Sequence, residues 1–169
     1  RSIFMTAEDT VADTVVKRVI KLGGDRTHIA VLEGFRDKNG RGPVNLDRDL
    51  DMLEQAIEDA QPLLVIIDPL TAYLGDINSH NDAAVRRTLE PVIKMLEQRR
   101  VALLGIAHLN KNQALDLMHR ISGSGAIVQT ARGGMFCGKH PQDPDRRVLT
   151  QFKKNLSGLP RSLDYILDG

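Results

Sequence analysis

Short apolar runs that alternate with amphipathic stretches are the feature that most constrains the fold of this chain. Runs of strand length occur at 3–5, 28–32, 63–67 and 101–107, and stretches with helical spacing occur at 11–22, 46–60 and 82–100. Strands that alternate with helices are typical of a parallel sheet, because parallel strands need a crossover connection. Aromatic residues make up only 4% of the chain, so aliphatic side chains must form the core. We therefore predict an α/β fold with a mostly parallel central sheet flanked by helices.

The character of the sequence changes after Asn110. Residues 111–125 are polar and rich in Gly and Ser, and a short helical stretch and three strand-like runs follow, at 134–137, 147–152 and 162–167. We expect these runs to form antiparallel strands that extend the sheet, within a single domain over residues 1–169. Cys137 is the one cysteine, and no apolar run has the length of a membrane span. We expect a cytoplasmic protein that does not contact a membrane.

Two carboxylates follow predicted strands. Asp68 ends the run 64–67 and Glu8 follows the first run, and ligands of open α/β sheets bind at the carboxyl ends of strands. Asp68 is the candidate acid for a nucleotide-bound Mg²⁺, and Glu8 is the candidate base that activates the attacking water. The alternatives are that Asp68 caps the turn at Pro69 and that Glu8 only favours a helix N-terminus by its charge.

A third strand end carries polar groups as well. His108 and Asn110 follow the run 101–107, where either side chain could sense the terminal phosphate of a nucleotide. A single histidine at a strand end is more often structural. Polar groups at three strand ends together indicate a functional edge of the sheet.

The segment 133–139 matches the first seven positions of the phosphate-binding loop pattern G-x-x-x-x-G-K-[ST], and His140 breaks the match. Such a loop must lead into a helix whose N-terminal amides hold phosphate. Here Pro141 and Pro144 bracket a turn that leads into a strand-like run. We therefore predict that this segment is not a phosphate-binding loop.

Charge is uneven along the chain. Residues 111–154 contain eight basic and three acidic residues, whereas residues 1–110 contain 14 basic and 17 acidic ones. A basic segment can face the phosphates of a nucleotide or of a nucleic acid, although the same balance is common on ordinary protein surfaces.

Six segments together resemble the RepA-like branch of the RecA superfamily, which includes hexameric replicative helicases and plasmid- and phage-encoded ATPases. The segments are 7–10, 64–74, 106–111, 120–124, 131–132 and 153–155. The resemblance covers nearly the whole chain. It implies a RecA-like fold and ATP hydrolysis with Mg²⁺ between adjacent subunits of a homo-oligomer, with a hexameric ring that acts on single-stranded DNA.

The resemblance also implies roles for individual residues. Glu8 would activate water, Asp68 would hold Mg²⁺, and His108 would couple the phosphate to a DNA-binding loop at 111–125. Within that loop Lys111, Arg120 and Ser122 would contact DNA, and Asn110 would lie beside the nucleotide. Arg132 and Lys153 match positions that insert a positive charge into the neighbouring subunit's site.

The sequence departs from the family's pattern at one point. The family's first strand and P-loop should precede Arg1, and neither occurs in the 169 residues. We expect this fragment to be inactive and the complete core to be an ATPase. Two other hypotheses stay open: a nucleotide-dependent regulatory switch, and a non-catalytic assembly or DNA-binding module that keeps the fold without hydrolysis.

Overall fold

The computed structural model describes residues 1–37, 40–42, 44–79, 81–110, 120–121, 125–155, 158 and 160–167. It divides into two compact units, residues 1–125 and 126–169. The prediction of a single core over 1–169 stays a prediction. No helix in the described part of the chain is both long and apolar enough to cross a membrane.

Unit 1 is built on a four-stranded parallel sheet, as the alternating pattern predicts. The strands are β1 (Ser2–Thr6), β2 (Ile29–Val31), β5 (Leu64–Asp68) and β6 (Ala102–Gly105), in the order β2-β1-β5-β6. The predicted strands are confirmed. A short hairpin of β3 (Phe35–Asp37) and β4 (Gly40–Gly42) was not predicted.

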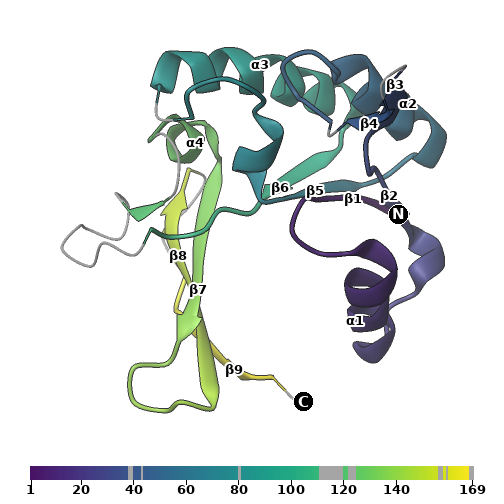
Figure 1. Ribbon diagram of the computed structural model, residues 1–169. Coiled ribbons are helices and arrows are strands. Elements are labelled where there is room, and N and C mark those ends of the chain that lie inside the picture. The colour runs from purple at the N-terminus through teal and green to yellow at the C-terminus, as the bar shows by residue number, and fades with distance from the viewer. Residues whose placement is uncertain are drawn as a thin grey trace. The chain divides into compact units, whose positions relative to one another are not determined.

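Helices lie on both faces of this sheet. On one side are α2 (Leu50–Ala60) and α3 (Asp82–Arg99), and on the other is α1 (Val16–Lys21), which a π-helical turn at Val11–Val15 precedes (Figure 1). Two short 3-10 turns, Arg26–His28 and Leu70–Tyr73, complete the unit. Pro91 is tolerated inside α3 because it lies on the exposed side, where water can satisfy the carbonyl group that the proline leaves unpaired.

The core of unit 1 lies between the sheet and the pair α2 and α3. Alternate residues of β1 and β5 point into it, and they meet aliphatic side chains of the two helices, because successive side chains of a strand point to opposite faces. The fully or almost fully buried side chains are Ile3, Met5, Leu53, Ile57, Val65, Ile67, Val85, Leu89, Val92 and Leu96. α1, by contrast, has no buried residue.

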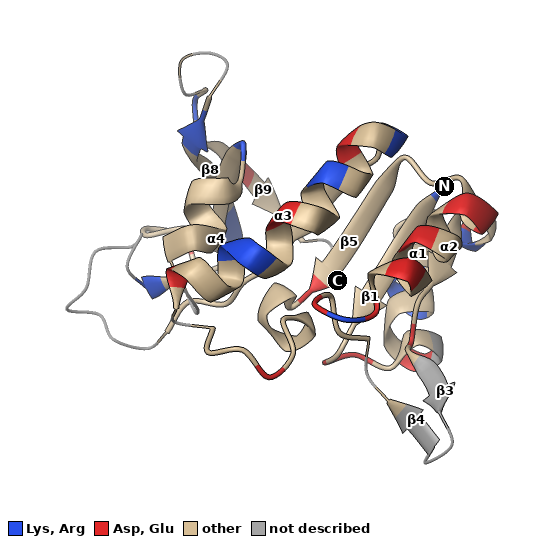
Figure 2. Ribbon diagram, turned by 90° about the horizontal axis from the view of Figure 1, so that it is seen from above, with Lys and Arg blue, Asp and Glu red and all other residues tan. Residues whose placement is uncertain are grey.

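Unit 2 contains α4 (Gly125–Thr130, whose first residue belongs to unit 1) and a three-stranded antiparallel sheet. The strands are β7 (Gly133–Lys139), β8 (Arg146–Lys154) and β9 (Leu163–Ile166), in the order β7-β8-β9, which confirms the predicted antiparallel pairing. Among the described residues these strands form a sheet of their own, so the expectation that they extend the parallel sheet is wrong. Segment 133–139 is the whole of β7, so the prediction that it is not a phosphate-binding loop is confirmed. β8 begins and ends with a pair of basic residues (Figure 2).

The segment before α2 is held by Asn45, which explains why the predicted helix 46–60 begins only at Leu50. Asn45 is 7% exposed, and its Oδ1 accepts a hydrogen bond from the Asp47 amide at 2.9 Å. The backbone amide of Asn45 donates a hydrogen bond to Asp49 Oδ2 at 2.8 Å. These bonds form a turn in place of the first helical turn. Gly75 lies against the Asn45 side chain, and a Cβ atom there would collide with it.

Gly75 has a φ of +73°, and we expect Gly75→Ala to lower the free energy of unfolding by about 3 kcal/mol. About 1 kcal/mol of this comes from the left-handed backbone and the rest from the collision with Asn45. Gly23→Ala is the matched control, because Gly23 has a φ of +74° and open space around its added Cβ. Urea denaturation of both variants measures the difference. Equal losses would show that Asn45 moves aside without cost.

Candidate active site

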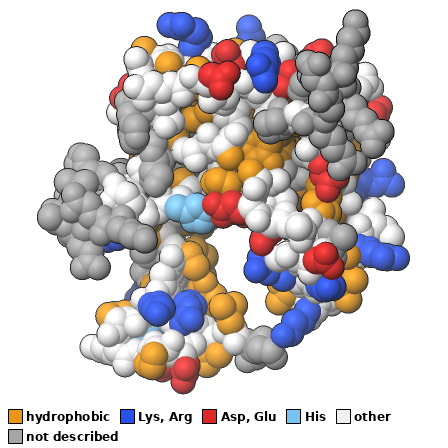
Figure 3. All heavy atoms as spheres, in the orientation of Figure 1, with side chains coloured by type: hydrophobic (Ala, Val, Ile, Leu, Met, Phe, Trp, Pro, Cys, Tyr) orange, Lys and Arg blue, Asp and Glu red, His pale blue; other side chains and the backbone are white. Residues whose placement is uncertain are grey.

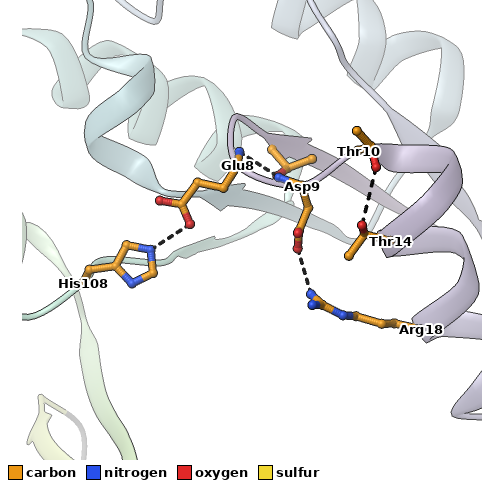
Figure 4. Close-up of polar contacts among 7 residues, drawn as sticks. Glu8, Asp9, Thr10, Thr14, Arg18 and His108 are labelled. Carbon is orange, nitrogen blue, oxygen red and sulfur yellow. Dashed lines mark hydrogen bonds and ion pairs between the residues drawn. The ribbon is translucent and has the colours of Figure 1, made fainter.

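The carboxyl ends of β1, β5 and β6 meet at one edge of the parallel sheet. Thr6 is the register partner of Asp68, and the Ala7 amide donates to the Asp68 carbonyl at 3.0 Å, so the chain leaves β1 directly beside Asp68. Glu8 and His108 follow the two strands on either side of β5. Their side chains meet, with Glu8 Oε2 and His108 Nε2 3.0 Å apart (Figure 4).

These three side chains form one cluster. One ligating atom each from Glu8, Asp68 and His108 lies within 4.8 Å of the others. His108 and Glu8 are 57% and 53% exposed, and a histidine lies beside an acidic side chain on the open surface in the space-filling view (Figure 3). A substrate can therefore reach the pair directly. The strand-end rule predicted all three residues, although the roles assigned to them stay predictions.

Asp68 is the most unusual member of the cluster. Its Oδ1 is buried and has no hydrogen-bond partner in the described part of the chain. Burial, and next the nearby charge of Glu8, raise the pKa of Asp68, while His108 opposes the shift. Burial and the charge of Asp68 also raise the pKa of Tyr73 to about 12. An acid kept partly buried and unpaired at a strand end is suited to bind a cation, which would supply the missing partner.

The loop after β1 aims Glu8 at His108. Thr6 Oγ1 accepts hydrogen bonds from the amides of Glu8 and Asp9 at 3.4 and 3.1 Å. Asp9 turns the other way and binds Arg18 of α1 at 2.7 Å (Figure 4). Glu8 therefore contacts His108, and Asp9 makes the contact with the first helix. Sequence reasoning did not assign Thr6 and Arg18 to this loop, although a threonine at a strand end is a common turn residue.

We expect Asp68→Asn to raise the free energy of unfolding by about 1 kcal/mol at neutral pH, because the amide removes a poorly solvated charge. The folded chain holds the Asp68 proton more tightly than the unfolded chain does, since its pKa is raised. The wild-type protein therefore loses stability as pH rises from about 4 through the raised pKa, and the variant does not. Thermal melts across pH measure this difference, which should vanish in acid. Asp13→Asn, at an exposed carboxylate, is the control. A variant less stable than wild type at neutral pH would contradict the expectation.

Two other predicted residues lie at the base of the segment 111–119. The Asn110 amide donates to the Arg120 carbonyl at 2.6 Å, and the Arg120 guanidinium donates back to the Asn110 carbonyl at 3.2 and 3.3 Å. An isolated bridge joins Leu109 and Ile121 beside them. These bonds hold Asn110 and Arg120, the residues on either side of 111–119, next to each other. Lys111 and Ser122 lie outside the described residues.

Arg132 and Lys153 belong to unit 2. The Lys153 Nζ donates to the carbonyl groups of Val128 and Gln129, at 2.8 Å each, and so binds the C-terminal end of α4. The Arg132 side chain is exposed, and its carbonyl accepts from the Asn155 amide at 3.3 Å. Lys153 therefore has a structural role that the sequence did not indicate. The proposed action of both residues on a neighbouring subunit stays a prediction.

The fold is similar to that of two solved structures. A KaiC-like protein from the hyperthermophilic archaeon Pyrococcus horikoshii OT3 aligns with a TM-score of 0.66 and 15% identity, over 96% of this chain and 71% of that protein. The RadB recombinase aligns with a TM-score of 0.68 and 12% identity, over 99% of this chain and 76% of the recombinase. At these identities the likeness is one of fold. Among curated proteins, none matches the sequence.

The parallel sheet with polar strand ends is thus a RecA-like α/β fold, as the sequence predicted. Residues 1–114 match the AAA domain family, which covers all three residues of the cluster. The chain belongs to this family of P-loop ATPases.

Proposed function

We propose that this protein is a magnesium-dependent ATPase, a RepA-like motor that acts on single-stranded DNA as a homo-oligomeric ring. The observation that carries the proposal is the convergence of Glu8, Asp68 and His108 at the carboxyl edge of the parallel sheet, in a chain of the AAA domain family. Ligands of such sheets bind at this edge.

Glu8 is the group suited to take a proton from water. Its carboxylate is exposed to solvent, and only one of its oxygens is engaged by His108, at 3.0 Å. The other oxygen can accept a hydrogen bond from a water molecule and orient it for attack. His108 contacts Glu8, and it lies between the end of β6 at Gly105 and residues 111–119. If phosphate binding breaks the contact between Glu8 and His108, the resulting change at His108 would signal to residues 111–119 that phosphate is bound.

Asp68 is the residue that would hold Mg²⁺. Its buried Oδ1, which has no hydrogen-bond partner among the residues that the structure describes, fits a cation, since carboxylate oxygens are the ligands that Mg²⁺ prefers. When bound, the ion supplies positive charge against the phosphates of the nucleotide.

Phosphate binding requires a further element in this proposal. We expect the family's first strand and P-loop upstream of Arg1, next to the free edge of β6. In the described part of the chain β6 is an edge strand, and its Leu104 is 40% exposed. An edge strand exposes backbone donors and acceptors that a further strand would satisfy. A loop that follows such a strand would reach the edge of the sheet where Asp68 lies.

Action on DNA and assembly into a hexamer rest on the basic segment 111–154 and on the family resemblance. Lys111, Arg120 and Ser122 would contact DNA phosphates, and Arg132 and Lys153 would act on the neighbouring subunit. A regulatory switch and a non-catalytic module would use the same fold, and they differ from a motor in their rates of hydrolysis.

Phosphate release separates these possibilities. The protein that carries its upstream residues should hydrolyse ATP only with Mg²⁺ and faster with single-stranded DNA, whereas the 169-residue chain should show negligible turnover. Slow hydrolysis that DNA does not change would favour the switch. Absence of hydrolysis by the longer protein would favour the non-catalytic module, and robust turnover by the short chain would contradict our assignment of the phosphate-binding segment.

A further inference from the structure

We propose that Glu8, Asp68 and His108 form a binding site for a divalent transition-metal ion, of the Zn²⁺, Co²⁺ or Mn²⁺ type, when no nucleotide is bound. This site differs from the magnesium position above, which needs only Asp68 and the phosphates of a nucleotide. Imidazole nitrogen is a good ligand for transition metals, whereas Mg²⁺ takes oxygen ligands and retains water. A set of two carboxylates and one histidine therefore favours a transition-metal ion over Mg²⁺.

The distances fit such a site. Transition metals bind these ligands at about 2.0–2.2 Å, which places neighbouring ligand atoms about 3–3.5 Å apart. Glu8 Oε2 and His108 Nε2 are already 3.0 Å apart, and all three ligand atoms lie within 4.8 Å of one another. A separation at the 4.8 Å limit would have to shorten by about 1.3 Å to reach that range, and a shorter one by less. Both Glu8 and His108 are more than half exposed, so rotation of their side chains can supply this movement.

The buried oxygen of Asp68 is an independent indication. Oδ1 has no hydrogen-bond partner within the described residues, although an unpaired buried acceptor is costly. A metal ion bound there would supply the missing contact. Coordination by His108 Nε2 requires its lone pair, so the ring proton resides on Nδ1 in the metal-bound form.

No other set of three potential ligands within the described ranges meets the same distance criterion. His28 provides a matched comparison, because its Nδ1 lies 3.0 Å from Asp25 Oδ2 and its side chain is 63% exposed. It has the same kind of carboxylate partner as His108, at the same distance. It lacks the third ligand, so this pair should bind a transition metal far more weakly.

The test uses the nucleotide-free 169-residue chain and Co²⁺, whose visible absorption reports inner-sphere ligands. We expect one Co²⁺ per chain at the strongest site, displaced by Zn²⁺. His108→Ala and Glu8→Gln should each weaken this binding tenfold or more, because each removes one ligand, and His28→Ala should leave it unchanged. Circular dichroism checks the folding of each variant, and Glu8→Gln decides the matter if His108→Ala does not fold, since Glu8 is exposed.

Three outcomes would overturn the proposal: no uptake of Co²⁺, uptake that survives both His108→Ala and Glu8→Gln in folded protein, or uptake lost in His28→Ala. The measurement needs no nucleotide. The result therefore tests the metal site independently of the proposed ATP hydrolysis. If both proposals hold, a bound transition metal occupies Glu8 and His108 and should inhibit hydrolysis until a chelator removes it.

Discussion

Glu8→Gln is expected to lower the rate of ATP hydrolysis by about 10²- to 10⁴-fold in the protein that carries its upstream residues, while nucleotide affinity stays nearly unchanged. Glutamine keeps the shape of the side chain and an oxygen that can face His108 Nε2, and it loses the basicity that water activation needs. Titration with a fluorescent nucleotide and steady-state phosphate release measure the two quantities separately. A parallel fall of affinity and rate would show that Glu8 is structural.

Asp9→Asn is the matched control for this experiment. Asp9 adjoins Glu8 and is also a carboxylate, but it binds Arg18 at 2.7 Å and not His108. Its replacement removes a partly exposed ion pair worth about 1 kcal/mol or less, so the hydrolysis rate should change little. A loss of rate as large as that of Glu8→Gln would indicate that the loop conformation, and not the base, limits the reaction.

Mixing two inactive variants is expected to restore hydrolysis. Subunits with Arg132→Ala retain Glu8, and subunits with Glu8→Gln retain Arg132, so a mixed ring contains junctions with both groups intact. A cation supplied to the transferring phosphoryl group from a neighbouring subunit contributes about a thousandfold or more in rate. Even a few repaired junctions should therefore exceed the activity of either variant alone. Phosphate release from premixed subunits measures the recovery.

The control replaces one component with subunits that carry both substitutions. Mixed with Arg132→Ala subunits, they provide no junction that has both Glu8 and Arg132, so activity should stay at the background level. If the first mixture also stays inactive while size-exclusion chromatography shows mixed oligomers, the prediction that Arg132 acts on a neighbouring subunit is wrong. Arg132 would then be a surface or DNA-contacting residue.

Much of unit 1 could be predicted from the sequence, because its strands are buried apolar runs and its helices have a regular apolar spacing. The rule that ligands bind at the carboxyl ends of parallel strands drew attention to Glu8 and His108, which are 100 residues apart in the chain and in contact in the structure. This rule depends only on strand direction, so it survives small errors in element boundaries. It identifies neighbours and does not assign their chemical roles.

Other features carried no usable sequence signal. The β3–β4 hairpin is short, and its second strand is Gly40-Arg41-Gly42, which has no apolar alternation. The late start of α2 results from the Asn45 turn, whose packing against Gly75 depends on tertiary structure. Lys153 binds backbone carbonyl groups 24 and 25 residues away, and carbonyl groups are the same in every residue. Local patterns cannot indicate such contacts.

The binding of Lys153 to the end of α4 has a consequence for communication around a ring. If Lys153 acts on the next subunit, its ammonium must first leave two carbonyl groups, which costs about 1.5–3 kcal/mol for each charged hydrogen bond. Only a neighbour whose site offers a stronger anion can offset this loss, since a ligand shifts an equilibrium by no more than its differential affinity. Lys153 would then stay bound to α4 when the neighbouring site is empty. It would leave α4 and contact the neighbouring site only when that site holds nucleotide. The end of α4 would loosen at the same moment, so each subunit would register the occupancy of the next one as a change in its own helix.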